Sequence, residues 1–200
     1  EDMVTASEAA AAKGGSQIYL KVGETMSVQD MLKSIAVSSA NDCACAMAEH
    51  IAGSESAFVE KMNEKAKLLG MNNTHFVNCT GLPDENHYTT IYDMYLITAK
   101  AIVLEEFVKI IHTESYDVEY MDALGNKVSK TWKNTCQYIN GNSTAPEGIT
   151  VIGGKTGTTN AAGSCLILYS KDNSGKPYAQ PLSVRCAVEA SIITTFSFST

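Results

Sequence analysis

One short stretch of the sequence combines a positive charge with several hydroxyl groups. Residues Ile149–Gly163 begin as a β-branched apolar run, which predicts a strand over 149–152, and this run breaks at Gly153–Gly154. The sequence Lys155-Thr156-Gly157-Thr158-Thr159 follows directly. Because glycine has no Cβ, a backbone at this point is able to approach a ligand closely. The lysine, the hydroxyls and the backbone N–H groups suit an anionic substrate held along a strand edge, with its carboxylate near Lys155.

A second polar cluster lies much earlier, at Ser38–Asp42. It separates two sets of apolar residues at helical spacing, namely Met31, Leu32 and Ile35 before it and Ala44, Met47, Ala48 and Ile51 after it. Side chains in a joint between two packed helices are held rigidly, which a catalytic site requires. The simpler interpretation is that Ser39 and Asn41 cap the second helix, because both residue types do this well.

The surrounding patterns indicate the elements that position these clusters. Helices are expected from Ser27 to the polar break, from 42 to Gly53, over about 55–69, over about 90–103 and near 104–112. Strands are expected at 16–21, 116–121, 127–132, 149–152, 165–170 and 183–188, with a long irregular connection over 71–88. Helices come first and strands later, so the sequence predicts an α+β fold with an antiparallel sheet. The helical part spans about 25–112 and the sheet part about 113–190.

Composition narrows the functions that are compatible with this chain. Its 200 residues are 44% hydrophobic, which suits one compact domain or a domain cut from a longer chain. The net charge is −7 and there is no basic run, so we expect no nucleic-acid partner. No apolar stretch is long enough to span a membrane, and the first residues are not a signal peptide.

The cysteines and histidines give no sign of a metal site. The six cysteines match neither a zinc site nor a small disulfide scaffold, so we expect mostly buried free thiols and no metal or cofactor. They are Cys43, Cys45, Cys79, Cys136, Cys165 and Cys186. His87 lies near Asp84 and Glu85, but no second histidine stands at ligand spacing, so we interpret it as packing within its loop.

Ser39-Ala40-Asn41 and Lys155-Thr156-Gly157 together resemble two of the three motifs of the penicillin-recognising serine enzymes, whose set is S-x-x-K, an S-D-N type triplet and K-T-G. Within that group the chain is most similar to the D-alanyl-D-alanine carboxypeptidases of the low-molecular-mass penicillin-binding class. The further stretches that resemble this family are Ser39–Ala48, Gly70–Phe76, Gly81–Thr90 and Tyr92-Asp93-Met94. The likeness runs from about residue 15 to about residue 175.

The resemblance implies a β-lactamase/transpeptidase-like fold and a serine acyl-enzyme reaction on peptidoglycan stem peptides that end in D-Ala-D-Ala, with β-lactams as inhibitors. It implies that Ser39 shuttles a proton, that Asn41 binds an amide of the substrate, and that Lys155 provides positive potential and supports Ser39. Thr156 and Thr159 would bind the substrate carboxylate, and the Thr158 N–H beside Gly157 would supply half of an oxyanion hole. It also implies a location outside the cytoplasm, with membrane attachment through segments absent from this sequence.

The sequence departs from the family pattern in one respect: none of its serines has a lysine three residues later. We therefore expect residues 1–200 to form a single, partial penicillin-binding domain without its first strands and nucleophile helix. Such a chain is expected to lack serine-acyl chemistry on its own. Two alternatives stay open. One is a class A β-lactamase, although the chain has no Glu-x-x-Leu-Asn run. The other is a non-catalytic module that binds cell wall or β-lactams.

Overall fold

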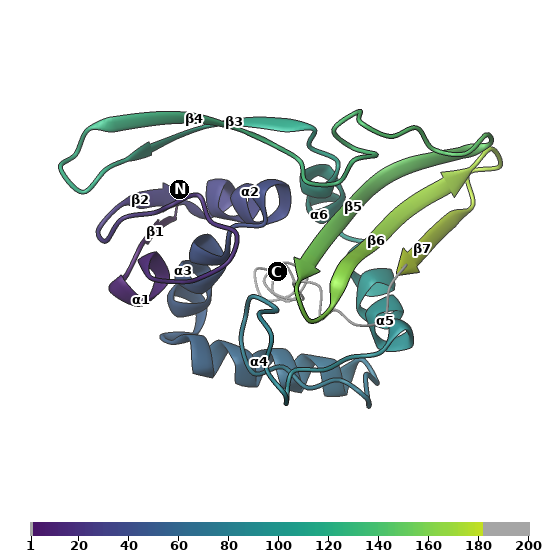
Figure 1. Ribbon diagram of the computed structural model, residues 1–200, viewed down its shortest axis with the longest axis horizontal. Coiled ribbons are helices and arrows are strands. Elements are labelled where there is room, and N and C mark those ends of the chain that lie inside the picture. Colours follow the sequence, from purple (N-terminus) through teal and green to yellow (C-terminus); the bar gives the residue numbers. More distant parts are fainter. Residues whose placement is uncertain (1, 182–200) are drawn as a thin grey trace.

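The computed structural model describes residues 2–181, which fold as helices packed against antiparallel sheets (Figure 1). This confirms the predicted α+β class. The helices are α1 (Glu8–Ala11), α2 (Val28–Ser38), α3 (Asn41–Ala52), α4 (Glu55–Leu68), α5 (Ile91–Ala101) and α6 (Glu105–Ile111). The strands are β1 (Met3–Thr5), β2 (Thr25–Ser27), β3 (Ser115–Met121), β4 (Lys127–Lys133), β5 (Ile149–Thr159), β6 (Gly163–Asp172) and β7 (Pro177–Pro181).

The strands form two separate sheets. One has the order β1-β2-β3-β4 and the other has the order β5-β6-β7, and every pair is antiparallel. Figure 1 shows the β3–β4 hairpin along the top of the molecule, the β5–β7 sheet to the right, and α2 and α3 to the left. β1, α1, β2 and β7 were not predicted from the sequence. The division into helical and sheet parts stays a prediction, and β1 and β2 lie in the same sheet as β3 and β4.

Helices α2 and α3 form where the apolar spacing predicted them. Ser27 caps α2, because its hydroxyl accepts the backbone N–H of Asp30 at 3.1 Å. The predicted apolar residues of both helices are buried or packed against the main core. Gly53 ends α3 with a φ of 83°, a left-handed conformation that glycine adopts without strain. The polar joint between the two helices is therefore anchored on both sides by core packing.

The strand predicted at 16–21 is wrong. The alternation that suggested it is real, because Ile18 and Leu20 are buried while Tyr19 is 74% exposed. The backbone N–H groups of Ile18 and Leu20, however, donate to the carboxylate of Asp42, at 3.3 and 3.0 Å. Tyr19 adopts a φ of 64°, which does not fit a strand. A buried side chain from α3 thus satisfies backbone groups that a neighbouring strand would otherwise have paired.

β5 also differs from its prediction, because it does not break at the glycines. The strand continues to Thr159, with a register shift between Val151 and Gly153, so that Lys155 lies inside the strand and pairs with Ile167 of β6. The glycines have a packing role instead. A Cβ on Gly153 would lie 2.4 Å from a side-chain carbon of Ile111 on α6, so glycine lets the strand and this helix approach closely.

The remaining elements largely match their predictions. The hairpin of β3 and β4 and the long connection after α4 form as expected, whereas the predicted strand at 183–188 lies outside the described residues. Cys43, Cys45, Cys79, Cys136 and Cys165 are buried free thiols, as predicted, and Cys186 lies outside the described part. In residues 2–181, no helix has both the length and the apolar character needed to cross a membrane.

Candidate active site

Ser39 and Lys155 are far apart in the sequence but in direct contact in the structure. The Lys155 ammonium donates to the Ser39 hydroxyl at 2.7 Å and to the carbonyl of Thr156 at 2.6 Å. Lys155 is only 8% exposed, because it projects from the interior of β5 toward the joint between α2 and α3. The pairing of these two residues, which the sequence patterns suggested separately, places a largely desolvated positive charge against a hydroxyl.

The backbone at Ser39 explains how its hydroxyl meets β5. Ser39 ends α2 in the left-handed conformation, with φ 60° and ψ 40°. This conformation is uncommon for a residue with a side chain, and such residues concentrate at functional sites. The interpretation that Ser39 and Asn41 cap the second helix is wrong, because Ala40 is the N-cap of α3 and Ser39 is instead the C-cap of α2.

Asn41, the first residue of α3, fixes the segment before residue 17. Its side-chain amide donates to the carbonyl of Gly14 at 2.9 Å, and its backbone N–H donates to the carbonyl of Ser16 at 2.8 Å. A Cβ at Gly15 would lie 2.5 Å from the Asn41 amide nitrogen. Asn41 is therefore buried behind the joint, where it holds Ser16 beside Ser39.

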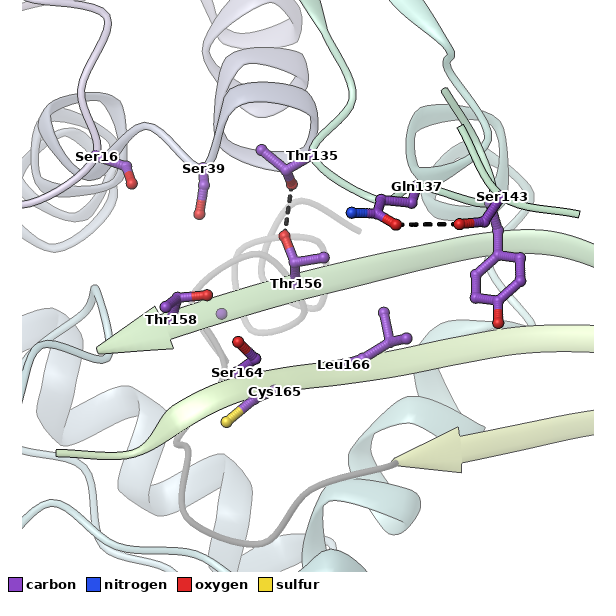
Figure 2. A pocket seen from close by; sticks show the side chains of 12 residues that line it. Ser16, Ser39, Thr135, Gln137, Ser143, Thr156, Thr158, Ser164, Cys165 and Leu166 are labelled. Atoms are coloured by element: carbon purple, nitrogen blue, oxygen red, sulfur yellow. Dashed lines mark hydrogen bonds between the residues drawn. The ribbon is translucent and has the colours of Figure 1, made fainter. Parts of the chain in front are cut away.

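A cavity of about 580 Å³ opens next to Ser39 (Figure 2). Its walls come from the segment at Ser16, the α2–α3 joint, the loop after β4, and strands β5 and β6. Figure 2 shows that its lining is rich in hydroxyl groups. The lining residues are Ser16, Ser39, Thr135, Gln137, Tyr138, Ser143, Thr156, Gly157, Thr158, Ser164, Cys165 and Leu166.

Three of the four predicted substrate-binding residues line this cavity. Thr156, Gly157 and Thr158 do so along β5, and the Thr156 hydroxyl donates to the Thr135 hydroxyl at 2.7 Å. Thr159 lies at the end of the strand, and its hydroxyl accepts the Ala162 N–H at 2.9 Å in the turn to β6. Lys155 does not line the cavity itself but contacts Ser39, which does. Hydroxyls and a strand backbone with a cation behind them are groups that can bind an anion.

The sequence did not predict that the loop after β4 forms one wall of the cavity. Asn134 holds this loop: its amide donates to the carbonyl of Thr113 at 2.9 Å, and its side-chain oxygen accepts the Cys136 N–H at 2.8 Å. The Ser143 hydroxyl donates to the Gln137 side chain across the loop, at 3.0 Å. The available signal was the polar stretch between two predicted strands, but nothing in it indicated which side chains face the cavity.

His87 lies outside this site and packs within its own loop, as predicted. The Val77 N–H donates to its Nδ1 at 3.2 Å, and its ring meets the edge of Phe76. Burial lowers the pKa of His87 despite the opposing effect of Asp84. Among residues 2–181 there is no group of three or more potential metal-binding side chains.

Residues 1–179 match the family model described as D-alanyl-D-alanine carboxypeptidase. The chain belongs to this family. The D-alanyl-D-alanine carboxypeptidase DacF of Bacillus subtilis is 43% identical over 179 residues, which are 89% of this chain and 43% of that protein. DacD of Escherichia coli is 33% identical, over 86% of this chain and 42% of that protein. The chain thus spans less than half the length of these relatives.

Solved structures in this group have the same fold. The Streptomyces K15 DD-transpeptidase matches with a TM-score of 0.80 and 26% identity, over 98% of this chain and 78% of that one. The D-alanyl-D-alanine carboxypeptidase DacD of Francisella tularensis matches with a TM-score of 0.76 and 27% identity, over 100% of this chain and 56% of that one. The family resemblance drawn from the two triplets and their neighbouring stretches is confirmed.

Proposed function

We propose that this chain is the penicillin-binding part of a serine-type D-Ala-D-Ala carboxypeptidase that acts on peptidoglycan stem peptides through an acyl-enzyme. The observation that supports this most is the 2.7 Å contact between Lys155 and Ser39 at the edge of a hydroxyl-lined cavity, in a chain of this family. Because a substrate of this kind belongs to the cell envelope, we propose that the site lies outside the cytoplasm.

Each side chain has a distinct role in the proposal. The Lys155 ammonium provides positive potential and holds the Ser39 hydroxyl, which relays a proton toward the leaving D-alanine. Thr156 binds the substrate carboxylate, with Thr159 at the end of the strand. The backbone N–H of Thr158, beside Gly157, stabilises the oxyanion. Asn41 binds the substrate amide in the family pattern. To bind the substrate, the Asn41 amide must first release the carbonyl of Gly14. If it keeps this hydrogen bond, its role is to order Ser16.

The attacking serine is proposed to belong to a part of the protein outside these 200 residues, because the sequence contains no Ser-x-x-Lys. The residues described above orient and polarise a substrate, but none of them is assigned the attack. The chain by itself is therefore expected to form no acyl-enzyme.

Intact mass after incubation with benzylpenicillin tests the proposal. We expect an adduct on the full protein that includes the Ser-x-x-Lys segment and no adduct on residues 1–200 alone. An adduct on the short chain would show that a residue not named here attacks. An adduct on neither would favour the alternative of a binding module without catalysis. Steady turnover of the β-lactam by the full protein would favour a β-lactamase instead.

The role of Lys155 is tested in the same full protein. Lys155→Ala is expected to slow acylation by about 100-fold or more, because it removes the charge that supports Ser39. Lys67→Ala is a matched control, since Lys67 lies on the exposed face of α4 and away from the cavity. Equal acylation rates for the two variants would contradict the proposed role.

A further inference from the structure

Two buried thiols from different segments meet beside the start of α4. Cys45 lies on α3, and Cys79 lies in the connection between α4 and α5. Both thiols lie next to one carboxylate, that of Glu55: the Cys79 sulfur donates to Oε1 at 3.3 Å, and the Cys45 sulfur lies 4.0 Å from Oε2. The chain therefore brings two free thiols to the two oxygens of one carboxylate.

The surroundings of the pair give the two thiols different reactivity. The neighbouring Cys79 thiol, together with the Lys13 ammonium, lowers the pKa of Cys45 against the effect of burial. The neighbouring Cys45 thiol and burial both raise the pKa of Cys79. A thiol with a lowered pKa is the better attacking group in thiol–disulfide exchange. Cys45 is thus suited to react first, while Cys79 stays protonated.

The two thiols are buried, but the polar groups beside them reach the surface. Lys13 and Glu55 form an ion pair, and their side chains are 19% and 25% exposed. Glu55 also accepts the backbone N–H of Cys79 at 3.2 Å, which fixes the carboxylate between the solvent and the two sulfurs. The route to the buried Cys45 that thiol–disulfide exchange requires therefore runs past this ion pair.

We propose that Cys45 and Cys79 form a reversible disulfide by exchange with a small-molecule disulfide. The Cys45 thiolate attacks one sulfur of the reagent, which gives a mixed disulfide on Cys45 and releases one thiolate of the reagent. The sulfur of Cys79 then attacks the sulfur of Cys45, which breaks the bond between Cys45 and the second half of the reagent. The proton of Cys79 passes to that departing sulfur, so that the second half leaves as a thiol. Two protein thiols are oxidised and one small disulfide is reduced to two thiols.

The disulfide would tie the connection after α4 to the helix that begins at Asn41. Asn78, next to Cys79, orders the following turn through hydrogen bonds to Thr80, Gly81 and Leu82. A Cβ on Gly15 would lie 3.2 Å from the Leu82 side chain and 2.5 Å from that of Asn41. The bond would therefore clamp a wall that borders the candidate site. The proposed location outside the cytoplasm, which rests on the proposed function, is an environment in which disulfides persist.

Peptide mapping after oxidation tests this inference independently of enzyme activity. The chain is incubated with rising ratios of oxidised to reduced glutathione, its remaining thiols are alkylated, and its peptides are analysed without reduction. We expect a linked Cys45–Cys79 peptide that a reductant removes. In Cys79→Ala, glutathione is expected to remain attached to Cys45. Separate alkylation of Cys45 and Cys79 at every ratio, or linkage of either to Cys43, would overturn the proposal.

Two further measurements separate a specific bond from general oxidation. Cys165→Ser is the matched control, because Cys165 is a buried thiol on β6, and this variant should still form the Cys45–Cys79 link. The link is expected to raise Tm by about 5–10 °C, because it restricts the unfolded chain. A link that forms but leaves Tm unchanged would contradict the proposed clamping of the loop.

Discussion

At the scale of single residues, Asp42 shows how a buried charge determines local structure. It is fully buried, and its two oxygens accept the backbone N–H groups of Ile18, Leu20 and Cys43. A buried carboxylate is tolerated when hydrogen bonds of this kind surround it. The segment that Asp42 holds passes through Ser16, whose side chain lines the cavity. One side chain on α3 thus supports both the fold and a wall of the candidate site.

This arrangement predicts a large effect of substitution at Asp42. Asp42→Ala leaves buried N–H groups of Ile18 and Leu20 without an acceptor, which should lower the free energy of unfolding by about 3 kcal/mol or more. Asp42→Asn retains one acceptor oxygen and should lose less. Urea unfolding measures both variants, with the exposed Glu64→Ala on α4 as a control that should change little. Wild-type stability in Asp42→Ala would show that the segment needs no support from this carboxylate.

At the scale of elements, the patterns in each segment predicted those helices and strands whose formation depends mainly on that segment's own sequence. Apolar spacing placed α2, α3 and the hairpin of β3 and β4, because burial of one face is a property of the segment itself. The strand wrongly expected at 16–21 has the same alternation, and its actual state depends on Asp42 from another segment. The triplets at Ser39 and Lys155 contain two residues that the structure brings into contact, and their assignment to the site stays a prediction. Thr135 and Gln137 were missed because their position depends on how the loop after β4 folds back over β5.

The close contact between β5 and α6 predicts that Gly153 cannot be enlarged without loss of stability. Gly153→Ala would place its Cβ against Ile111, so one of the two elements must shift. Overpacking of this kind should lower the free energy of unfolding by about 1–3 kcal/mol. In an Ile111→Ala background the clashing atoms are absent, so the added effect of Gly153→Ala should be smaller. Unfolding measurements on the four variants form a double-mutant cycle, and additive effects would contradict the contact.

At the scale of the whole molecule, the candidate site is built from segments that are distant in the sequence. The cavity draws on the region of Ser16, the joint at Ser39, the loop from Thr135 to Ser143, and strands β5 and β6. The main core lies beneath the first two of these segments and includes Cys165, Ile167 and Tyr169 of β6. A site assembled in this way depends on the helices and the β5–β7 sheet folding together, so its stability should follow that of the core.

Strands β4 and β6 differ in burial, which predicts different protection against hydrogen exchange. β4 has no buried residue along Lys127–Lys133, whereas β6 buries Cys165 and most of its central residues. Amides near the β3–β4 turn should therefore exchange by local opening, at a far lower free energy than amides of the β5–β6 pair at Lys155 and Ile167. Hydrogen-exchange mass spectrometry on the chain measures this difference. Equal protection of both regions would mean that the hairpin and the site unfold as one unit, and fast exchange at Lys155 would mean that β5 is not held by the core.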